Sequence, residues 1–435
     1  MVDCENMPPP NPDMLSLLPP QSASGFGATS FVFFVSSIMA LNALGIDSML
    51  PALPTIGNAL RVAHVNDRQW IIAIFMLGFG LAQIVWGPLA DHYGRKPLLI
   101  IGVTSFAISN LLAGLASSFS MLLVARLLGG ASAAASRIIL ISVIRDCYSG
   151  RQMARVMSLA IMMIYLVPMF APSLGQAIAA ILGSWRAIFF MLAAYAGAVG
   201  AFGLIRLKET LHPEVRRPLN FATVADAFGQ VIRDRSAIGY TMASACSFAC
   251  VSSFVMSVEP VFTDIFHVQD EFPILFAGIG GCMAIAMFLN AWLVERFGTR
   301  LISHIALIAF IAVNVLHLAV AATRGETLYS FVALQGVQMF FYGLLSSNFN
   351  SMAMEPVGDI AGSASSVQGF MSTCIGVGFG AAIGQLFDST TFPLALGFLG
   401  CSLLCLCAVL YAEQGRLFRS RQTIIGTTSD LSSKV

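Results

Sequence analysis

The sequence predicts an all-α integral membrane protein with twelve transmembrane helices in two pseudo-symmetric six-helix bundles, and three observations support this. Hydrophobic residues make up 57% of the chain and charged residues only 10%, whereas soluble domains carry about 25% charged residues. Apolar runs of roughly 20 residues, the length that crosses a bilayer, follow one another along most of the chain. A charged loop after the second run has a counterpart after the eighth, which indicates repeated halves.

The chain begins with a segment that does not resemble a membrane span. Residues 1–25 are rich in proline, mildly acidic, and lack a basic stretch followed by an apolar run. This composition argues against a secretory signal and predicts a disordered cytoplasmic tail.

The twelve apolar runs divide the chain into two halves. The first six cover about 30–54, 69–91, 98–117, 120–146, 154–182 and 185–206. The other six cover about 237–262, 272–294, 301–322, 327–353, 360–386 and 392–413. We therefore predict an N-terminal bundle over 26–206, a cytoplasmic linker over 207–236, a C-terminal bundle over 237–415 and a cytoplasmic tail over 416–435.

Basic residues give the orientation. With the N-terminus inside, most Lys and Arg fall in inner segments, and the outer loops hold only Arg61, Arg68, Arg186 and Arg324. The positive-inside rule then places both termini in the cytoplasm. In the linker, Leu219, Val224, Phe228 and Ile232 fall near one helical face, which predicts an amphipathic helix on the inner membrane surface; a plain helical connector is the open alternative.

Composition and motifs narrow the function classes. Most of the nine cysteines lie inside apolar runs without metal-ligand spacing, so we expect buried apolar thiols, no metal site and no disulfides. The formal net charge of +1 gives no indication of a nucleic-acid partner. No nucleophile–base pair or ATP-binding Gly-rich signature is present, so an enzyme is disfavoured and no cofactor is expected.

The loop after the second run, Gly87 to Leu99 (GPLADHYGRKPLL), combines an acid, a turn and a basic pair. Asp91 can bond the N-terminus of the next helix or an arginine across the bundle, and Gly94 permits a sharp turn. We expect Arg95 and Lys96 at the anionic lipid surface. A charged hinge between two spans suggests a gate; a plain topogenic loop is the alternative.

The second half repeats this loop in weaker form. The segment from Ala291 to Arg300 reads AWLVERFGTR, so that Glu295 corresponds to Asp91 and Arg300 to Lys96. Its position six spans later makes a chance repeat a poor explanation.

Five segments carry a resemblance to one transporter family. Gly87–Leu99 resembles the loop signature of the major facilitator superfamily, and Leu44–Ile56 resembles the Asp-x-x-x-Pro-x-x-Pro segment of its twelve-span drug:proton antiporters. Arg126–Ala134 and Val167–Gln176 resemble further antiporter motifs, although Val167–Gln176 departs from its motif and so leaves the transport direction open. Met354–Phe370 resembles the Bcr/CflA multidrug exporters. The resemblance implies a major facilitator fold, a bacterial inner-membrane location and a monomer.

Two ionisable residues inside spans are candidates for proton coupling. A charge there costs about 2.5–3.5 kcal/mol on insertion scales and usually faces a cavity or a partner. Asp47 lies in the outward half of the first span and Arg126 at comparable depth in the fourth, and the resemblance implies that both helices adjoin a central cavity. We expect protonation of Asp47 to be coupled to its access to Arg126. Alternatively, Asp47 caps the irregular backbone before Pro51 and Pro54.

Other polar residues in spans are candidates for the cavity or its gates. Arg137 shares a helical face with Arg126, about 16 Å along the helix, and either handles negative charge or bonds carbonyls at the inner gate. Glu259 near the outer end of the seventh span is either a cavity acid or a solvated interfacial residue. A polar stripe in the tenth span predicts cavity lining or interhelical packing; it comprises Gln335, Gln338, Tyr342, Ser346 and Asn350.

In the fifth span, Pro168 and Pro172 each remove a backbone hydrogen bond, and Gly175 follows them. A kink here would let the helix flex between states.

Together these features predict a secondary transporter driven by the proton gradient, with a small-molecule substrate and the lipid bilayer as its partners. The first hypothesis is export of small amphipathic or cationic drugs by rocking two halves around a midplane cavity. The alternative is transport of a single metabolite or siderophore-like solute in either direction. A membrane enzyme or receptor is the third and least favoured hypothesis.

Overall fold

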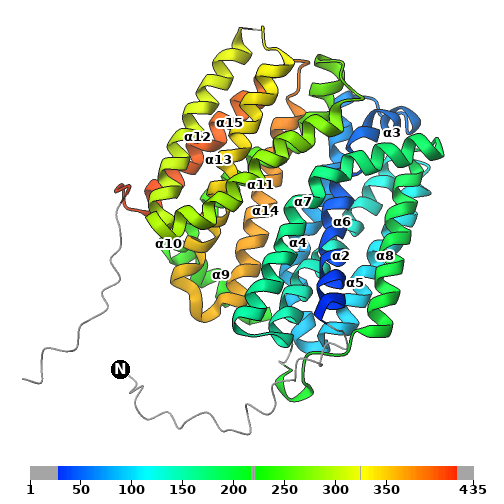
Figure 1. The fold of residues 1–435 in the computed structure, drawn as a ribbon, viewed down its shortest axis with the longest axis vertical. Coiled ribbons are helices and arrows are strands. Elements are labelled where there is room, and N and C mark those ends of the chain that lie inside the picture. Colours follow the sequence, from blue (N-terminus) through cyan, green and yellow to red (C-terminus); the bar gives the residue numbers. More distant parts are fainter. Residues whose placement is uncertain (1–27, 217–218, 220, 324, 419–435) are drawn as a thin grey trace, which may run out of the picture.

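The computed structural model describes residues 28–216, 219, 221–323 and 325–418. The predicted tail over 1–25 and most of that over 416–435 lie outside these residues. Within them, twelve helices are long and apolar enough to cross a membrane, and no β-strand occurs. Figure 1 shows the helices in two groups, one from each half of the chain. The predicted all-helical fold with twelve spans is therefore confirmed for the described part of the chain.

The N-terminal half forms the first group. Its spans are α2 (Ala28–Asp47), α4 (Trp70–Tyr93), α5 (Arg95–Gly114), α6 (Phe119–Cys147), α7 (Gly150–Leu182) and α8 (Arg186–Arg206). The short helices η2 (Leu50–Ala52), α3 (Leu53–Ala59) and η3 (Val65–Gln69) join α2 to α4. Pro51 and Pro54 stand at the starts of η2 and α3, where a missing N–H is tolerated. The regular helix of the first span therefore ends at Asp47.

The C-terminal half forms the second group. Its spans are α10 (Arg235–Pro260), α11 (Phe272–Phe297), α12 (Thr299–Ala322), α13 (Leu328–Met354), α14 (Ala361–Gln385) and α15 (Phe392–Ala412). The π-helical turn η5 (Val261–Ile265) extends α10, and η6 (Glu355–Ile360) joins α13 to α14. Thr327 and Ser330 form a reciprocal capping box that starts α13.

The start of α2 and the end of α15 lie at the same end of the molecule (Figure 1). We call it the inner end, because the sequence predicts that it faces the cytoplasm, and the opposite end the outer end. Between the halves, η4 (Pro213–Val215) and α9 (Phe221–Arg233) form the connection.

The apolar face of α9 packs against protein. Val224, Ala227 and Val231 are buried in a small core with residues of α14, and the ring of Phe228 lies 5.8 Å from that of Phe370. Ile232, expected on the same face, is 52% exposed. The linker helix therefore docks on the inner end of the C-terminal half.

The two halves touch through a symmetric set of helices. The main contacts across the interface pair α4 with α14 and α7 with α11. Helices α4 and α11 are the second spans of their halves, and α7 and α14 are the fifth spans. Each half therefore contributes its second and fifth spans to the interface. This pattern is expected of repeated bundles that enclose a site at their interface.

Candidate functional site

A cavity of about 310 Å³ lies between the two halves. Residues of α2, α4, α6 and α7 form one side, and residues of α10, α11, α13 and α14 form the other. Most lining side chains are apolar, with aromatic and methionine side chains on both sides, among them Phe79, Met169, Phe248 and Met283. Such a surface can contact apolar molecules of varied shape.

Asp47 is the last residue of α2 and lines this cavity. Its side chain is buried within the protein, with a residue exposure of 5%. Among the described residues, no hydrogen bond or ion pair of its carboxylate is found, so Asp47 does not cap the backbone before Pro51. The end of α2 thus places the Asp47 carboxyl group where it can interact with a molecule in the cavity.

Arg126 stands beside α2 without contacting the Asp47 carboxylate. It is 2% exposed, its Nη2 donates to the carbonyl oxygen of Gly45 at 2.7 Å, and its Nε donates to that of Ile71 at 3.2 Å. Its guanidinium carbon lies 4.1 Å from the centre of the Phe75 ring. Arg126 does not line the cavity. It joins α6 to the backbones of α2 and α4, and the predicted pair with Asp47 is not a direct contact here.

Arg137 is the second charged residue on the cavity wall, and its side chain is exposed there. Of the two alternatives for Arg137, the one that bonds carbonyls has no such hydrogen bond in the described part of the chain. Three further polar atoms of the wall are buried without a hydrogen-bond partner among the described residues: Asn42 Oδ1, Ser136 Oγ and Ser244 Oγ. Because buried polar atoms are normally hydrogen-bonded, these three leave unused hydrogen-bonding capacity in the cavity wall.

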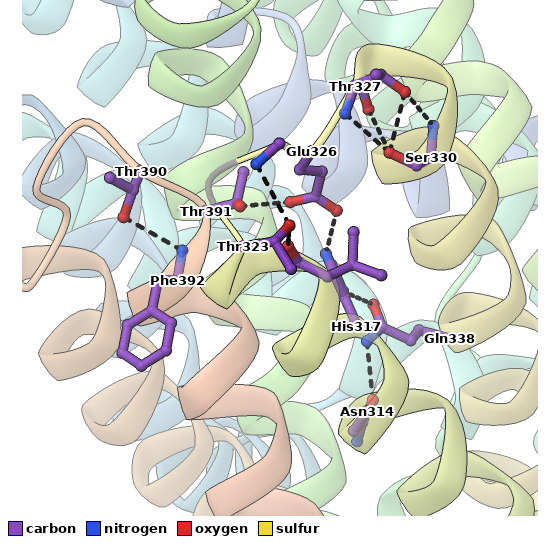
Figure 2. A network of polar contacts seen from close by, with 12 residues as sticks. Asn314, His317, Thr323, Glu326, Thr327, Ser330, Gln338, Thr390, Thr391 and Phe392 are labelled. Atoms are coloured by element: carbon purple, nitrogen blue, oxygen red, sulfur yellow. Dashed lines mark hydrogen bonds and ion pairs between the residues drawn. The ribbon is translucent and has the colours of Figure 1, made fainter.

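The polar stripe of α13 divides into two parts. Tyr342, Ser346 and Asn350 line the cavity, whereas Gln335 and Gln338 are fully buried away from it. Gln335 shares the helical face of Tyr342 but lies about 10 Å nearer the outer end, where the cavity does not reach. Gln338 is rotated toward α12, where it bonds Asn314 and faces His317 (Figure 2). For these two residues the expected lining role is corrected to packing within the bundle.

Glu259 does not line the cavity either. It is 3% exposed near the end of α10, and its Oε1 has no hydrogen-bond partner in the described structure. Its helix α10 continues directly into η5, and the side chain lies inside the bundle. The two alternatives, a cavity acid or a solvated interfacial residue, are both replaced by a buried position.

The two halves are fastened together at their outer ends. The side-chain amide of Asn66 donates to the carbonyl oxygens of Gln385 and Phe387, each at 2.9 Å, and Gln385 Nε2 donates to the Asn66 carbonyl at 2.8 Å. We call this set the outer clasp. Further inward, Gln83 Nε2 donates to Thr373 Oγ1 at 3.1 Å.

At the inner end, Arg95 is buried among acids. Its exposure is 8%, its Nη1 lies 2.5 Å from Asp91 Oδ1, and its Nε lies 3.2 Å from Asp146 Oδ2. The expectation that Arg95 lies at the lipid surface is therefore wrong. The approach of α6 brings Asp146 to the loop, and two acids hold the guanidinium inside the protein.

Glu209, in the segment after α8, completes this inner cluster. Its carboxylate accepts hydrogen bonds from the backbone N–H groups of Arg95 at 2.9 Å and Lys96 at 3.2 Å, the first residues of α5. An acid at a helix N-terminus is favoured by the unpaired N–H groups there. Gly94 has φ 106°, and a Cβ at this position would lie 2.5 Å from Glu209 Oε2. The predicted turn thus requires glycine both for its backbone angle and for its closeness to Glu209.

The second half builds a related cluster around Arg300. Its Nη2 lies 3.0 Å from Glu355 Oε2, and its Nε lies 2.9 Å from Glu413 Oε1, which also accepts a hydrogen bond from Tyr240 at 2.6 Å. Burial of the Glu413 carboxyl raises its pKa, but the hydrogen bonds from Tyr240 and Arg300 outweigh burial and bring the pKa below its usual value.

The two inner clusters occupy corresponding places. Asp146 and Glu355 stand at the inner ends of the fourth spans of their halves, and Glu209 and Glu413 follow the sixth spans. Glu295, the expected counterpart of Asp91, is exposed and has no ion pair among the described residues.

Gly87 faces Ser366 of the other half, whose Oγ would be 3.6 Å from an added Cβ.

Sequence reasoning missed the acids that complete these clusters, namely Asp146, Glu209, Glu355 and Glu413. A signal was present, because each is an acid within three residues of the inner end of a span, in a chain with few charges. The pairing itself depends on the packing of helices distant in sequence.

The proline-containing helix α7 is helical throughout, and Pro168 lines the cavity. Gly175 lies at a close contact with the segment after α2. A Cβ at this position would lie 1.6 Å from the carbonyl oxygen of Ser48. Only glycine lets α7 approach the backbone break that follows Asp47.

The sequence profile of the Major Facilitator Superfamily matches residues 35–381. The chain belongs to the Major Facilitator Superfamily. Its segments with the loop, first-span, fourth-span and fifth-span motifs all fall within the matched residues.

Related proteins agree with this assignment. The chain is 28% identical to the uncharacterized MFS-type transporter YdgK of Bacillus subtilis (strain 168), over 84% of this chain and 90% of that protein. It is 27% identical to a bicyclomycin resistance protein homolog of Haemophilus influenzae, over 89% of this chain and 97% of that protein. It is 24% identical to the multidrug resistance protein MdtL of Salmonella heidelberg, over 91% and 98% respectively.

Solved structures share the fold. A bacterial homolog of the human lysosomal transporter Spinster, in an inward-facing and unoccupied conformation, aligns with a TM-score of 0.66 and 16% identity, covering 89% of this chain and 95% of that one. The human organic anion transporter MFSD10 aligns with a TM-score of 0.65 and 18% identity, covering 89% and 100%. The chain is thus a multi-pass membrane protein of a transporter family that acts on small molecules.

Proposed function

We propose that this chain is a proton-coupled secondary transporter that exports small amphipathic or cationic compounds by alternating access. The observation that carries the proposal is Asp47, a carboxyl without a protein partner among the described residues, on the wall of a mostly apolar cavity between the halves. The printed names of two relatives, a bicyclomycin resistance protein homolog and a multidrug resistance protein, support drug export.

Competition at Asp47 provides the coupling. A cationic substrate in the cavity is attracted by the ionised carboxylate, and protonation removes that charge, so that the proton and the cation exclude each other. Apolar lining residues such as Phe79 and Phe248 supply the remaining contact area. Arg126 holds the last turn of α2 through Gly45 and so positions Asp47 without neutralising it.

The arrangement described here corresponds to the inward-facing state in this proposal. The outer clasp joins the halves at their outer ends, whereas the cavity lining extends toward the inner end as far as Asn350, which is exposed. Opening outward requires the clasp to break and the inner ends to close. The proton gradient supplies the energy, the protein works as a monomer, and both termini lie in the cytoplasm of a bacterial cell.

Transport in everted membrane vesicles tests the proposal. Vesicles containing the wild-type protein and energised to an acidic interior should accumulate a fluorescent amphipathic cation such as ethidium, and addition of ethidium should release protons. D47N should abolish both signals at an unchanged protein level. The matched control is D270N, a carboxyl-to-amide change at an exposed residue of the outer end. Full ethidium uptake by D47N would overturn the coupling role of Asp47.

Arg137 favours a second candidate function, transport of one anionic or zwitterionic metabolite. Its guanidinium is exposed in the same cavity as Asp47, so the lining carries one charge of each sign. Under this alternative, R137Q abolishes uptake of an anionic solute, and wild-type cells gain no resistance to amphipathic cations. Under the first proposal, R137Q changes the preference among substrates but leaves cation export in place.

A further inference from the structure

A buried polar chain runs through the outer part of the C-terminal half, away from the cavity (Figure 2). Asn314 Nδ2 donates to the carbonyl oxygen of Phe398 at 3.3 Å, and Gln338 Nε2 donates to Asn314 Oδ1 at 2.9 Å. His317 Nδ1 then lies 3.1 Å from Gln338 Oε1. On the other side of the ring, His317 Nε2 lies 3.0 Å from Glu326 Oε1.

This polar chain ties together elements that are separate in sequence. Asn314 and His317 belong to α12, Gln338 to α13, and Glu326 to the loop between them. The second carboxylate oxygen of Glu326 accepts a hydrogen bond from the hydroxyl of Thr391, at the start of α15. All of these groups are closely buried: His317 is 1% exposed, and the Glu326 side chain is 5% exposed.

The positions of the hydrogens along this polar chain follow from the group at its end, the Phe398 carbonyl. The Phe398 carbonyl can only accept, so the Asn314 amide must present its NH₂ group there and its oxygen to Gln338. Gln338 must then present its NH₂ group to Asn314 and its oxygen to His317. An amide oxygen can only accept, so the His317 Nδ1 must carry a hydrogen.

With Nδ1 protonated, the remaining ring nitrogen decides the charge of the site. In a neutral imidazole, Nε2 presents a lone pair, and an ionised Glu326 would present another lone pair 3.0 Å away. Neither Nε2 nor Glu326 Oε1 has a hydrogen-bond partner elsewhere in the described structure. A single proton between the two atoms removes the repulsion, either as an imidazolium–carboxylate pair or as an imidazole–carboxylic acid pair.

We propose that His317 and Glu326 form a second proton-binding site, which holds one proton between them and fastens α12 to the loops that begin α13 and α15. Loss of this proton leaves a buried negative charge opposite a lone pair, which is costly in a dry site. Removal of the shared proton is therefore expected to weaken the attachment of α12 to these two loops.

Other ionisable groups on the helices and loops around His317 and Glu326 do not contact these two residues. On the outer parts of these elements they include Glu259 of α10, Asp264 of η5, His267, Asp270 and Glu271 before α11, Tyr329 of α13 and Asp388 before α15. In the described part of the chain none of them bonds His317 or Glu326. Asp388 accepts instead from Thr390, and Tyr329 is 85% exposed. The Phe331 ring also lies beside the imidazole, with its centre 5.8 Å from that of His317.

The test compares the thermal stability of the purified full-length protein with that of E326Q between pH 6 and pH 9. The amide side chain of that variant can donate to His317 Nε2 and accept from Thr391, so it reproduces the contacts without a titrating proton. We expect equal Tm values at pH 6, and a wild-type Tm lower by about 2–4 °C at pH 9. The matched control E271Q, at an exposed residue, should follow the wild type. Parallel curves for wild type and E326Q would overturn the proposal.

A second measurement on the wild type covers the case in which E326Q does not fold. In ¹⁵N-histidine-labelled protein, with the His317 signals assigned by their absence in H317Q, Nδ1 should remain protonated at every pH while Nε2 responds to pH. An unprotonated Nδ1, or an Nε2 signal that does not move with pH, contradicts the proposal. Both measurements are made without transport, so their outcome is independent of whether the protein exports drugs.

Discussion

Arg126 donates a 2.7 Å hydrogen bond to the carbonyl oxygen of Gly45, two residues before Asp47, and makes no contact with the Asp47 carboxylate in the described structure. The arginine and the acid are thus neighbours with separate tasks. Arg126 fixes the end of α2 from α6, and Asp47 faces the cavity. The sequence suggests an ion pair between Arg126 and Asp47, but in this structure Arg126 instead holds the backbone that carries the Asp47 carboxyl group.

Replacement of Arg126 should damage the fold more than the coupling chemistry. R126A removes two buried charge-assisted hydrogen bonds, each of which contributes about 1.5–3 kcal/mol, and with them the link from α6 to α2 and α4. We expect a loss of roughly 3 kcal/mol or more, seen as a large fall in Tm of the purified protein, whereas D47N keeps the wild-type Tm. Wild-type stability of R126A together with uncoupled transport would instead indicate a direct role in coupling.

Gly175 should tolerate no side chain. A methyl group in G175A would lie 1.6 Å from the Ser48 carbonyl oxygen, so α7 and the backbone after α2 must separate. We expect poor expression and lost transport. The control is G197A in α8, where an added Cβ has nothing within 4 Å and alanine is favoured over glycine in a helix by about 0.5–1 kcal/mol. Equal expression of the two variants would show that the approach of α7 to Ser48 is dispensable.

The twelve spans were predictable because their signal is local: each span needs only sufficient length and a lack of charged residues. The basic residues near the span ends predict on which side of the membrane each loop lies. The environment of Arg95 was not predictable in the same way. Local sequence shows a basic residue at a membrane surface. Asp146, which pairs with its guanidinium, comes from α6, and Glu209, which accepts from its backbone N–H, comes from the segment after α8.

The polar stripe of α13 shows a second limit. Helical periodicity predicts which residues share a face, so it correctly grouped Tyr342 with Asn350 on the cavity. Periodicity does not show how deep the cavity extends, and Gln335 lies beyond its outer limit. It also does not show that a polar partner on α12 turns Gln338 away from the cavity.

Glu413 should give the protein an acid-sensitive component of stability. Its pKa lies below the usual value because the hydrogen bonds from Tyr240 and Arg300 outweigh the effect of burial. The stabilisation from a lowered carboxyl pKa is complete above the unfolded value, about 4.3, and is lost as the pH falls through the folded value. E413Q should therefore be less stable than wild type at pH 7, and the difference in Tm should shrink below about pH 4.5. A difference that stays constant with pH would contradict the pairing.

The outer clasp should open and close during transport if the halves rock against each other. Asn66 bonds the end of α14 through three hydrogen bonds that involve Gln385 and Phe387, and these bonds cannot survive separation of the outer ends. We expect a cross-link between cysteines introduced at Asn66 and Gln385 to stop ethidium transport in vesicles, with recovery on reduction. The control pair replaces Asn66 and Asn58, which lie in the same half and keep their separation as the halves move. If the cross-linked Asn66–Gln385 pair transports at the wild-type rate, the outer ends do not separate, and a route through the outer end between the halves is excluded.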